Sequence, residues 1–422
     1  MSRKKRVQGG STPPTNLSAF RDEERRWKSR IAPPDLSLAF DADDIVWDEP
    51  TAHSAADEPV RGTWTSGTGH KEECYRIALD ELVGTGFLGQ TRWKGKQRAE
   101  VGDYAIIVPR IPGFVFFPRI LPEQLQRDLV VETLCHAGEP NLTSLDNHYE
   151  LPPGGLWNAW REGRGDQAVR RKAFEPEGRN ESGIGTSGSG FDSRPTPNAS
   201  AEHAPVRQDE KAVTVADLLT KLRWANVGWH YNWSTKLYEY ERGQPPLPPF
   251  LHRCCRTLAR VVPWQQIYRP DDLAASDDCL DRPALSREVW AKWKETYEPD
   301  AGIVNFYQAK DSLTSHVDLA EVDAVSPLVS LSLGLSSIFL VGGTSRDVPP
   351  LAILLRSGDA LIVSGPSRRA YHALPRVLEG TLPDHLRPDP PDLDDEQKAD
   401  YRLYGEYLER GARINVNVRS VM

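Results

Sequence analysis

Residues 412–419 read ARINVNVR, and this stretch decides the fold class because polar and apolar residues alternate along its whole length. Successive side chains of a β-strand point to opposite faces, so the alternation predicts a strand with two different faces. One face carries Arg413, Asn415, Asn417 and Arg419. Four polar side chains are costly to bury without partners, and Arg binds carboxylates through paired hydrogen bonds. The strand therefore predicts a pocket for a dicarboxylate ligand, with a solvated edge strand as the alternative.

The sequence before this strand predicts further strands. Residues 324–343, AVSPLVSLSLGLSSIFLVGG, contain no charge and have the length of a membrane span. However, Val329, Leu331 and Leu333 alternate with small residues, which is typical of strands. We interpret the segment as two buried strands and expect no membrane span. Helices are predicted mainly in the N-terminal half, so the chain belongs to the α+β class.

The composition is that of a folded chain with long loops. The 422 residues include 12 Trp, too many for a disordered chain, whereas 34 Pro and 32 Gly indicate extended loops. Five Cys, an odd number, favour free thiols in a reducing compartment over a disulfide scaffold. The net charge of −8 argues against nucleic-acid binding by bulk electrostatics. Such a role needs a local basic surface, for which the Arg368-Arg369 pair is a candidate.

Changes in composition predict the domain boundaries. We expect residues 1–110 to form a largely flexible N-terminal extension with one helix near 16–31, and residues 111–422 to form the globular domain. Within that domain, residues 162–212 are rich in Gly, Ser, Asn and Pro and predict a disordered insert. Residues 183–188 in this insert match GxGxxG, but no strand precedes them and no helix follows, so we expect no nucleotide site. Residues 269–300 are charged and predict a surface insertion.

The N-terminus gives a weak indication of location. Residues 3–6 form the basic run RKKR, which is either a nuclear-import signal or a solvated tail. No apolar stretch follows the run, and the acidic residues at 22–24 do not fit a mitochondrial presequence. We expect the protein in the nucleus or the cytoplasm, or in both; a mitochondrial location is possible but finds no support in this segment.

Three residues form a candidate metal site. His316 and Asp318 share a face if they lie on a strand, and a third ligand must come from a strand distant in sequence. The His residues that follow are His372, just after a predicted strand, and His385, in a loop rich in Pro and Asp. His372 is the better candidate, although it could be unrelated to His316. A second motif, His148-Tyr149-Glu150, lies in a Pro- and Gly-rich loop with no matching Arg strand, and we do not expect it to bind metal.

Taken together, these motifs resemble the AlkB family of Fe(II)/2-oxoglutarate dioxygenases. The family pattern is N-x-Y, H-x-D, a distal His and R-x-N-x-x-x-R, which stands here as Asn305/Tyr307, His316/Asp318, His372 and Arg413/Asn415/Arg419. The sequence between these motifs, such as VGWHYNWSTKLY at 227–238, is similar to that of the eukaryotic AlkB homologue 1 subgroup. Two positions depart from the family: Asn417 stands where Thr is frequent, and Trp229 stands where Tyr is frequent.

The resemblance implies a double-stranded β-helix (jelly-roll) core with an N-terminal helical extension and flexible inserts. It also implies that His316, Asp318 and His372 hold Fe(II), and that Arg413 pairs with the distal carboxylate of 2-oxoglutarate. The rest of the cosubstrate pocket would be Asn305, Tyr307, Asn415, Asn417 and Arg419. A substrate lid would contain Trp229, His230, Tyr231 and Tyr238, whose aromatic faces can stack on an extruded base; core packing is the alternative for this aromatic run.

The implied reaction is oxidative demethylation of N-methylated bases in DNA or RNA, such as N6-methyladenine in DNA or N1-methyladenine in tRNA. It would consume O₂ and 2-oxoglutarate and release formaldehyde, succinate and CO₂. We expect a monomer that acts on nucleic acid without a membrane. Two alternatives remain: a 2-oxoglutarate-dependent protein hydroxylase or demethylase, and a nucleic-acid-binding module with an inactive site.

Overall fold

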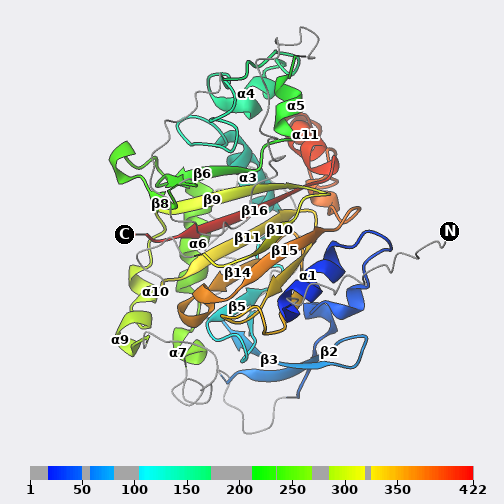
Figure 1. Cartoon of the computed structure of the whole chain (residues 1–422), viewed down its shortest axis with the longest axis vertical. Coiled ribbons are helices and arrows are strands. Elements are labelled where there is room, and N and C mark those ends of the chain that lie inside the picture. Colours follow the sequence, from blue (N-terminus) through cyan, green and yellow to red (C-terminus); the bar gives the residue numbers. More distant parts are fainter. Residues whose placement is uncertain are drawn as a thin grey trace, which may run out of the picture.

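Strand β16 (Ala412–Arg419) lies inside the larger of two antiparallel sheets, between β9 (Ala301–Gln308) and β11 (Leu328–Gly334) (Figure 1). We describe a computed structural model, which covers residues 18–49, 58–79, 104–172, 212–233, 235–268, 285–318 and 325–421. The sequence prediction of a strand at this position is confirmed. Its two faces are both buried, so β16 is not the solvated edge strand that was the alternative.

Ten strands form the larger sheet, in the order β1-β2-β3-β4-β5-β14-β11-β16-β9-β6. Besides the three strands above, they are β1 (Val46–Trp47), β2 (Val60–Thr65), β3 (Lys71–Ala78), β4 (Tyr104–Ile107), β5 (Phe114–Phe117), β6 (Trp224–Gly228) and β14 (Ala360–Val363). The smaller sheet has the order β10-β15-β12-β13, with β10 (Leu313–His316), β15 (His372–Val377), β12 (Ser337–Val341) and β13 (Leu351–Leu355). A short separate hairpin pairs β7 (Tyr231–Asn232) with β8 (Leu237–Tyr238).

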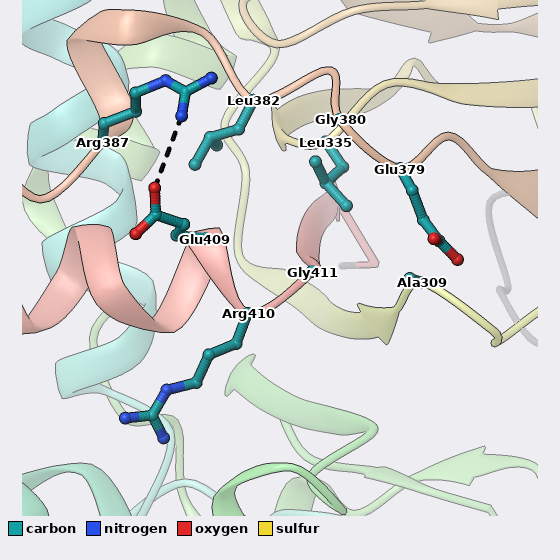
Figure 2. A pocket seen from close by; sticks show the side chains of 9 residues that line it. All are labelled: Ala309, Leu335, Glu379, Gly380, Leu382, Arg387, Glu409, Arg410 and Gly411. Carbon is teal, nitrogen blue, oxygen red and sulfur yellow. Dashed lines mark hydrogen bonds and ion pairs between the residues drawn. The ribbon is translucent and has the colours of Figure 1, made fainter.

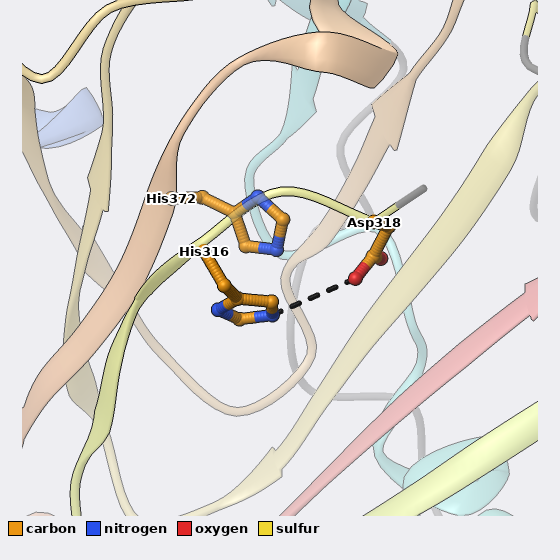
Figure 3. A group of neighbouring side chains, drawn as sticks. All are labelled: His316, Asp318 and His372. Carbon is orange, nitrogen blue, oxygen red and sulfur yellow. Dashed lines mark ion pairs between the residues drawn. The ribbon is translucent and has the colours of Figure 1, made fainter. Parts of the chain in front are cut away.

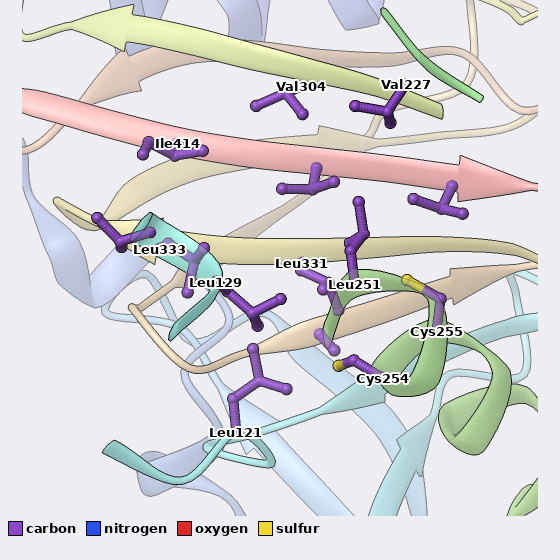
Figure 4. Close-up of a cluster of buried hydrophobic side chains, with 14 of the residues drawn as sticks. Leu121, Leu129, Val227, Leu251, Cys254, Cys255, Val304, Leu331, Leu333 and Ile414 are labelled. Carbon is purple, nitrogen blue, oxygen red and sulfur yellow. The ribbon is translucent and has the colours of Figure 1, made fainter. Parts of the chain in front are cut away.

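The cores show how these layers pack. One buried cluster contains Phe116 and Leu361 of the larger sheet with Ile353 and Leu355 of the smaller one, so the two sheets pack against each other. Two antiparallel sheets packed in this way fit the jelly-roll core that the family resemblance implies. The largest cluster lies on the other face of the larger sheet, where Ile414 and neighbouring apolar residues meet the helices (Figure 4).

Helices cover both outer faces of the sandwich. On the larger sheet they include α3 (Glu123–Cys135), α4 (Gly155–Arg161), α5 (Val215–Leu219), α6 (Pro249–Arg260), α7 (Trp264–Ile267), α9 (Arg287–Trp290), α10 (Trp293–Thr296) and α11 (Asp395–Glu409). On the smaller sheet, α1 (Ala19–Lys28) packs Phe20 and Trp27 against Leu340 and Ala373. The helix lies within the range 16–31 where the sequence predicts one.

The N-terminal part differs from the expected flexible extension. Strands β2, β3 and β4 extend the larger sheet, and β4 pairs with β5 across the expected boundary at residue 110. Trp64 and Cys74 of these strands are buried in the cluster between the sheets. The described residues before 110 therefore belong to the same fold as the rest, because their apolar faces continue its core.

Two predicted inserts fall partly outside the described residues. The GxGxxG match, the basic run at 3–6 and most of the insert at 162–212 lie outside them. Of the expected surface insertion at 269–300, residues 285–300 are described; their charged residues are mostly exposed, but their aromatic residues are not. Trp290, Trp293 and Tyr297 are buried in the largest core cluster, because helices α9 and α10 turn their aromatic residues inward.

The uncharged segment 324–343 contributes two strands, as predicted, but they belong to different sheets. Strand β11 lies in the larger sheet and β12 in the smaller one, and Gly334 between them has φ +82. An added Cβ at Gly334 would lie 2.7 Å from the Ala412 carbonyl oxygen, so this corner requires glycine. Among the described residues, no helix combines the length and the hydropathy that a membrane span needs.

Candidate active site

Neighbouring strands of the smaller sheet bring two histidines together. His316 on β10 is the register partner of His372 on β15, and their ring centroids are 4.4 Å apart. The register shifts between Leu313 and His316, which indicates a bulge in β10. Asp318 follows directly after β10, and its Oδ1 lies 3.5 Å from His316 Nε2 (Figure 3).

The three side chains can act as a ligand set. A ligand atom from each of His316, Asp318 and His372 lies within 4.8 Å of the other two. Backbone carbonyls orient both rings. His316 Nδ1 lies 2.9 Å from the Thr314 carbonyl oxygen, and His372 Nδ1 lies 3.2 Å from the Ala370 carbonyl oxygen. With Nδ1–H donating to a carbonyl, each ring presents the lone pair of Nε2 to a common point.

The electrostatics favour a cation at this point. Burial opposes the charge of Asp318, but contact with His316 and the nearby His372 and Arg419 hold the pKa of its carboxyl well below the usual value. Burial, together with the charge of His316, lowers the pKa of His372 to about 4. The pKa of His316 is raised because the hydrogen bond and charge of Asp318 outweigh its burial.

Asp318 is therefore present as an ionised carboxylate and His372 as a neutral imidazole, and His316 is neutral once a cation replaces its proton. Two imidazole nitrogens and one carboxylate match the facial ligand set of non-haem iron enzymes. The side chains of His316 and Asp318 are 25% and 30% exposed, so the site is accessible. The residues fit Fe(II).

The polar face of β16 points to the side of the sheet opposite the helices. Ile414, Val416 and Val418 belong to the core cluster beneath the helices, so the residues between them face the smaller sheet. Arg413 is fully buried; its Nη1 donates to the Leu335 carbonyl at 3.0 Å and its Nη2 to Ser332 Oγ at 2.9 Å.

The guanidinium of Arg413 is incompletely paired. Its Nε is buried without a hydrogen-bond partner, and burial lowers the pKa of Arg413 to about 10 although Tyr307 and Asp359 favour the charge. Within the described residues no carboxylate forms an ion pair with Arg413. A buried cation in this condition fits a site for a ligand carboxylate.

The other predicted pocket residues line the same face. Asn415 lies opposite Asn305 on β9, with Asn305 Nδ2 3.5 Å from Asn415 Oδ1, and it donates to Ser330 Oγ at 2.9 Å. Tyr307 is the register partner of Arg413, and burial raises the pKa of its hydroxyl. Asn417 is half-buried one step further along the strand.

Arg419, at the end of β16, connects the pocket to two other parts of the site. Its side chain is 5% exposed, and its Nη1 lies 4.0 Å from Asp318 Oδ2. On its other side, Nε donates to the hydroxyl of Tyr238 at 2.8 Å. The metal ligands and the predicted lid therefore both contact one residue of the predicted cosubstrate pocket.

The four predicted lid residues lie together after β6. Tyr231 and Tyr238 are register partners in the β7–β8 hairpin, with ring centroids 5.4 Å apart, and Trp229 packs on Tyr240 at 5.1 Å. His230 is different: it is 5% exposed, and burial together with the charge of Arg242 lowers its pKa. A buried, neutral His230 supports the lid and does not offer an accessible ring surface.

Several other sequence candidates are separate from this site. Of the Arg368-Arg369 pair considered as a local basic surface, Arg368 is buried and donates to the Ser326 carbonyl at 3.3 Å, whereas Arg369 is exposed. His385 Nε2 forms a hydrogen bond with Gln126 Oε1 at 3.0 Å. His148 and His385 do not belong to the metal-ligand group found among the described residues.

A cavity of about 320 Å³ lies elsewhere, beside the C-terminal end of α11 (Figure 2). Its lining carries both signs of charge, and Arg387 Nη1 lies 3.5 Å from Glu409 Oε1 across it. The lining residue Leu335 also accepts a hydrogen bond from Arg413 through its carbonyl. None of the predicted site residues lines this cavity.

Sequence reasoning missed the residues that support the polar face. Ser330 and Ser332 accept from Asn415 and Arg413, and Asp300 links the end of β16 to the lid through its backbone and side chain. The serines alternate with apolar residues on β11, so the period of two could have placed them on the pocket face. Nothing in the local sequence of Asp300 indicates its role.

Comparison with known proteins agrees with this geometry. A model of the 2OG-Fe(II) oxygenase superfamily matches residues 196–419, which contain all the predicted site residues. The chain is 31% identical over 215 residues to the DNA N(6)-methyladenine demethylase ALKBH1A of Arabidopsis thaliana, covering 51% of this chain and 53% of that protein. It therefore spans about half the length of that relative.

Two further relatives match over a longer stretch. The tRNA demethylase abh1 of Schizosaccharomyces pombe is 27% identical over 317 residues, which cover 74% of this chain and 80% of that protein. The nucleic acid dioxygenase ALKBH1 of Mus musculus is 30% identical over 326 residues, covering 74% and 64%. Among solved structures, "The structure of OsALKBH1" aligns with 73% of this chain and 97% of that chain at a TM-score of 0.37 and 18% identity.

Proposed function

Because the chain belongs to the 2OG-Fe(II) oxygenase superfamily, we propose that it is a dioxygenase that demethylates N-methylated bases of DNA or RNA. The single observation that carries the proposal is the convergence of two imidazoles and one carboxylate, together with a buried, incompletely paired arginine on the polar face of β16. This arrangement supports both a metal ion and an anionic cosubstrate.

In this proposal the residues have separate tasks. His316, Asp318 and His372 hold Fe(II), and Arg413 pairs with the distal carboxylate of 2-oxoglutarate. Asn305, Tyr307, Asn415, Asn417 and Arg419 complete the cosubstrate pocket. When bound, the iron with 2-oxoglutarate and O₂ supplies the oxidation of the N-methyl group, with succinate, CO₂ and formaldehyde as products.

The chain itself contributes orientation and exclusion of water. The carbonyls of Thr314 and Ala370 fix the two imidazole rings, so their Nε2 atoms are aimed before any ion binds. Burial of Arg413 and Tyr307 keeps the far end of the pocket dry, which strengthens the pairing between a guanidinium and a carboxylate.

Two observations support nucleic acid as the substrate. Aromatic residues gather on the lid, where Trp233 and Tyr240 are 38% and 39% exposed and can offer their faces to a base. The relatives are named for demethylation of DNA, for demethylation of tRNA and for oxidation of nucleic acid. N6-methyladenine in DNA and N1-methyladenine in tRNA are the two substrates to compare first.

The test measures succinate and formaldehyde with Fe(II), ascorbate and 2-oxoglutarate. Substrates are single-stranded DNA with N6-methyladenine, tRNA with N1-methyladenine, and the unmethylated forms of both. His316→Ala should abolish turnover. His148→Ala is the matched control, because His148 is exposed and belongs to the motif that does not join the metal-ligand group.

The results separate the alternatives. Formaldehyde formed only with a methylated nucleic acid, and lost in His316→Ala but not in His148→Ala, would support the demethylase. Succinate formation indifferent to every nucleic acid would favour the protein hydroxylase. A chain that binds Fe(II) and 2-oxoglutarate without any turnover would contradict the dioxygenase and favour the inactive binding module.

We further infer that the protein acts as a monomer in the nucleus, the cytoplasm or both. The basic run at residues 3–6 supports the nuclear part. Light scattering after size-exclusion chromatography tests the monomer, and a fluorescent fusion in which the run is replaced by alanines tests the location.

A further inference from the structure

Arg419 lies where three parts of the site meet. It is buried on β16, and at the end of this strand it pairs in register with Ala301 of β9 and Leu328 of β11. Its Nη1 lies 4.0 Å from Asp318 Oδ2, so the guanidinium reaches the edge of the metal site. Its Nε donates to Tyr238 at 2.8 Å, and its guanidinium carbon lies 5.9 Å from the centre of the Tyr238 ring.

The lid segment is fixed to the sheet at both ends. At its start, Trp229 N donates to the Asp300 carbonyl at 3.1 Å, and at its end Gln244 Nε2 donates to the same oxygen at 3.1 Å. Asp300 in turn is joined to β16, because its N–H donates to the Arg419 carbonyl at 3.1 Å and its Oδ1 accepts from Val421 N at 2.8 Å. These contacts define where the lid begins and ends.

The hairpin between these ends has its own contact with the pocket. Tyr238 lies on β8, and its hydroxyl reaches Arg419 from the lid side. A guanidinium is planar, so a hydrogen bond at Nε sets the plane in which the two Nη groups lie. Tyr238 therefore helps to orient the guanidinium of Arg419, whose Nη1 lies toward Asp318.

We propose that Tyr238 is a positioning residue that couples the lid hairpin to the cosubstrate pocket through Arg419. The inference rests on the proposed function, since it takes Arg419 to be part of the pocket that binds 2-oxoglutarate. Cosubstrate binding fixes the guanidinium, and the fixed guanidinium holds Tyr238 and its hairpin. By thermodynamic linkage, a hairpin held by Arg419 strengthens cosubstrate binding to the same extent.

This role differs from the one that the sequence predicted for Tyr238. As a lid residue it would present its ring to a substrate base, whereas here its hydroxyl is engaged with the pocket. The substrate then meets a lid hairpin that is held more firmly when the cosubstrate is bound, because Arg419 contacts both.

The test uses Tyr238→Phe, which keeps the ring and removes the acceptor for Arg419 Nε. Binding of 2-oxoglutarate is measured by titration calorimetry with Mn(II) in place of iron, so no turnover is needed. Hydrogen–deuterium exchange of peptides covering 229–233 and 235–242 is compared with and without Mn(II) and 2-oxoglutarate. Tyr240→Phe is the matched control, since its hydroxyl lies 3.5 Å from the Val421 carbonyl and not on Arg419.

In the wild type we expect the cosubstrate to slow exchange of the lid peptides. In Tyr238→Phe the dissociation constant of 2-oxoglutarate should rise about tenfold, as expected for losing a hydrogen bond to a charged group. The slower exchange should disappear in the same variant, with the thermal unfolding midpoint unchanged. Tyr240→Phe should behave like the wild type in both measurements.

Other results overturn the inference in distinguishable ways. If Tyr238→Phe binds 2-oxoglutarate like the wild type and keeps the cosubstrate-dependent protection, Tyr238 does not couple the two sites. If both Phe variants weaken binding equally, the effect is general to the lid. If the wild type binds no 2-oxoglutarate, the proposed function fails and the inference fails with it. If Arg419→Met loses 2-oxoglutarate binding but Tyr238→Phe does not, the inference fails and the proposed function stands.

Discussion

Replacement of Arg413 by Met should separate cosubstrate binding from stability. Arg413 is fully buried, with two hydrogen bonds to neutral oxygens and an Nε that has no partner. Burial lowers the pKa of Arg413 from 12.5 to about 10, which corresponds to roughly 3 kcal/mol by which the folded protein disfavours the charge. The site therefore holds a cation at a cost that a bound carboxylate would remove.

The magnitude for the free protein follows from two opposing effects. Arg413→Met removes the cost of burying the charge, but it leaves Leu335 O and Ser332 Oγ without their donor, at roughly 1–3 kcal/mol each. We expect these effects to offset each other largely, so the free energy of unfolding should change by less than about 2 kcal/mol. Binding of 2-oxoglutarate loses a charge-assisted, two-bond contact and should weaken at least about a hundredfold.

The assay is titration calorimetry with Mn(II) and 2-oxoglutarate, combined with urea unfolding of the free protein. Arg127→Met is the matched control, because Arg127 is equally buried but already has a carboxylate, Asp392, at 2.6 Å. Breaking that buried pair should lower the free energy of unfolding by about 3–5 kcal/mol. The folded Arg127→Met protein should keep its affinity for 2-oxoglutarate. Wild-type affinity in Arg413→Met, or a stability loss as large as that of the control, would refute the reasoning.

Three further predictions test other parts of the molecule. His372→Ala should abolish Mn(II) binding measured by electron paramagnetic resonance; an unchanged affinity would place the metal elsewhere. Burial and the charge of Arg127 lower the pKa of His385 to about 4, so the unfolded state binds the proton first as the pH falls from about 6.5 to about 4. The free energy of unfolding should fall in this window by up to about 1.4 kcal/mol per pH unit, and His385→Gln should flatten that slope in urea titrations at several pH values. Gly228 has φ +70, and an added Cβ would lie 2.1 Å from the Asp300 carbonyl oxygen. Gly228→Ala should therefore lower the free energy of unfolding by about 1–3 kcal/mol. An unchanged free energy of unfolding would show that the backbone at the base of the lid can shift.

The placement of the polar residues of β16 on one face could be predicted from the sequence, because they repeat every second position. The alternation in residues 413–419 depends only on strand geometry, and the structure keeps it: apolar residues face the helices, polar residues face the smaller sheet. The metal ligands needed one more step, because His316 and His372 are distant in sequence and only the pairing of β10 with β15 brings them together.

The N-terminal strands could not be predicted in the same way. Strand β3 has a burial pattern that alternates between exposed and buried positions at its start, and the exposed residues there, Lys71 and Glu73, are charged. Such a segment resembles a solvated loop until its partner is known, and here the pairing with β2 and β4 supplies the missing information. Residues 285–300 had a usable signal, since Trp290, Trp293 and Tyr297 recur at helical spacing, but the charged residues around them concealed it.

The bulge in β10 shows why the metal site depends on a detail of register. Between Leu313 and His316 the strand has two residues, Thr314 and Ser315, where β15 has only Ala373 between Leu374 and His372. Without the extra residue, His316 would be one position out of step, and a one-residue shift turns a side chain to the other face of a sheet. The bulged Thr314 also supplies the carbonyl that orients His316 Nδ1 at 2.9 Å. The same irregularity therefore places the ligand opposite its partner and aims its free nitrogen, which a regular strand could not do.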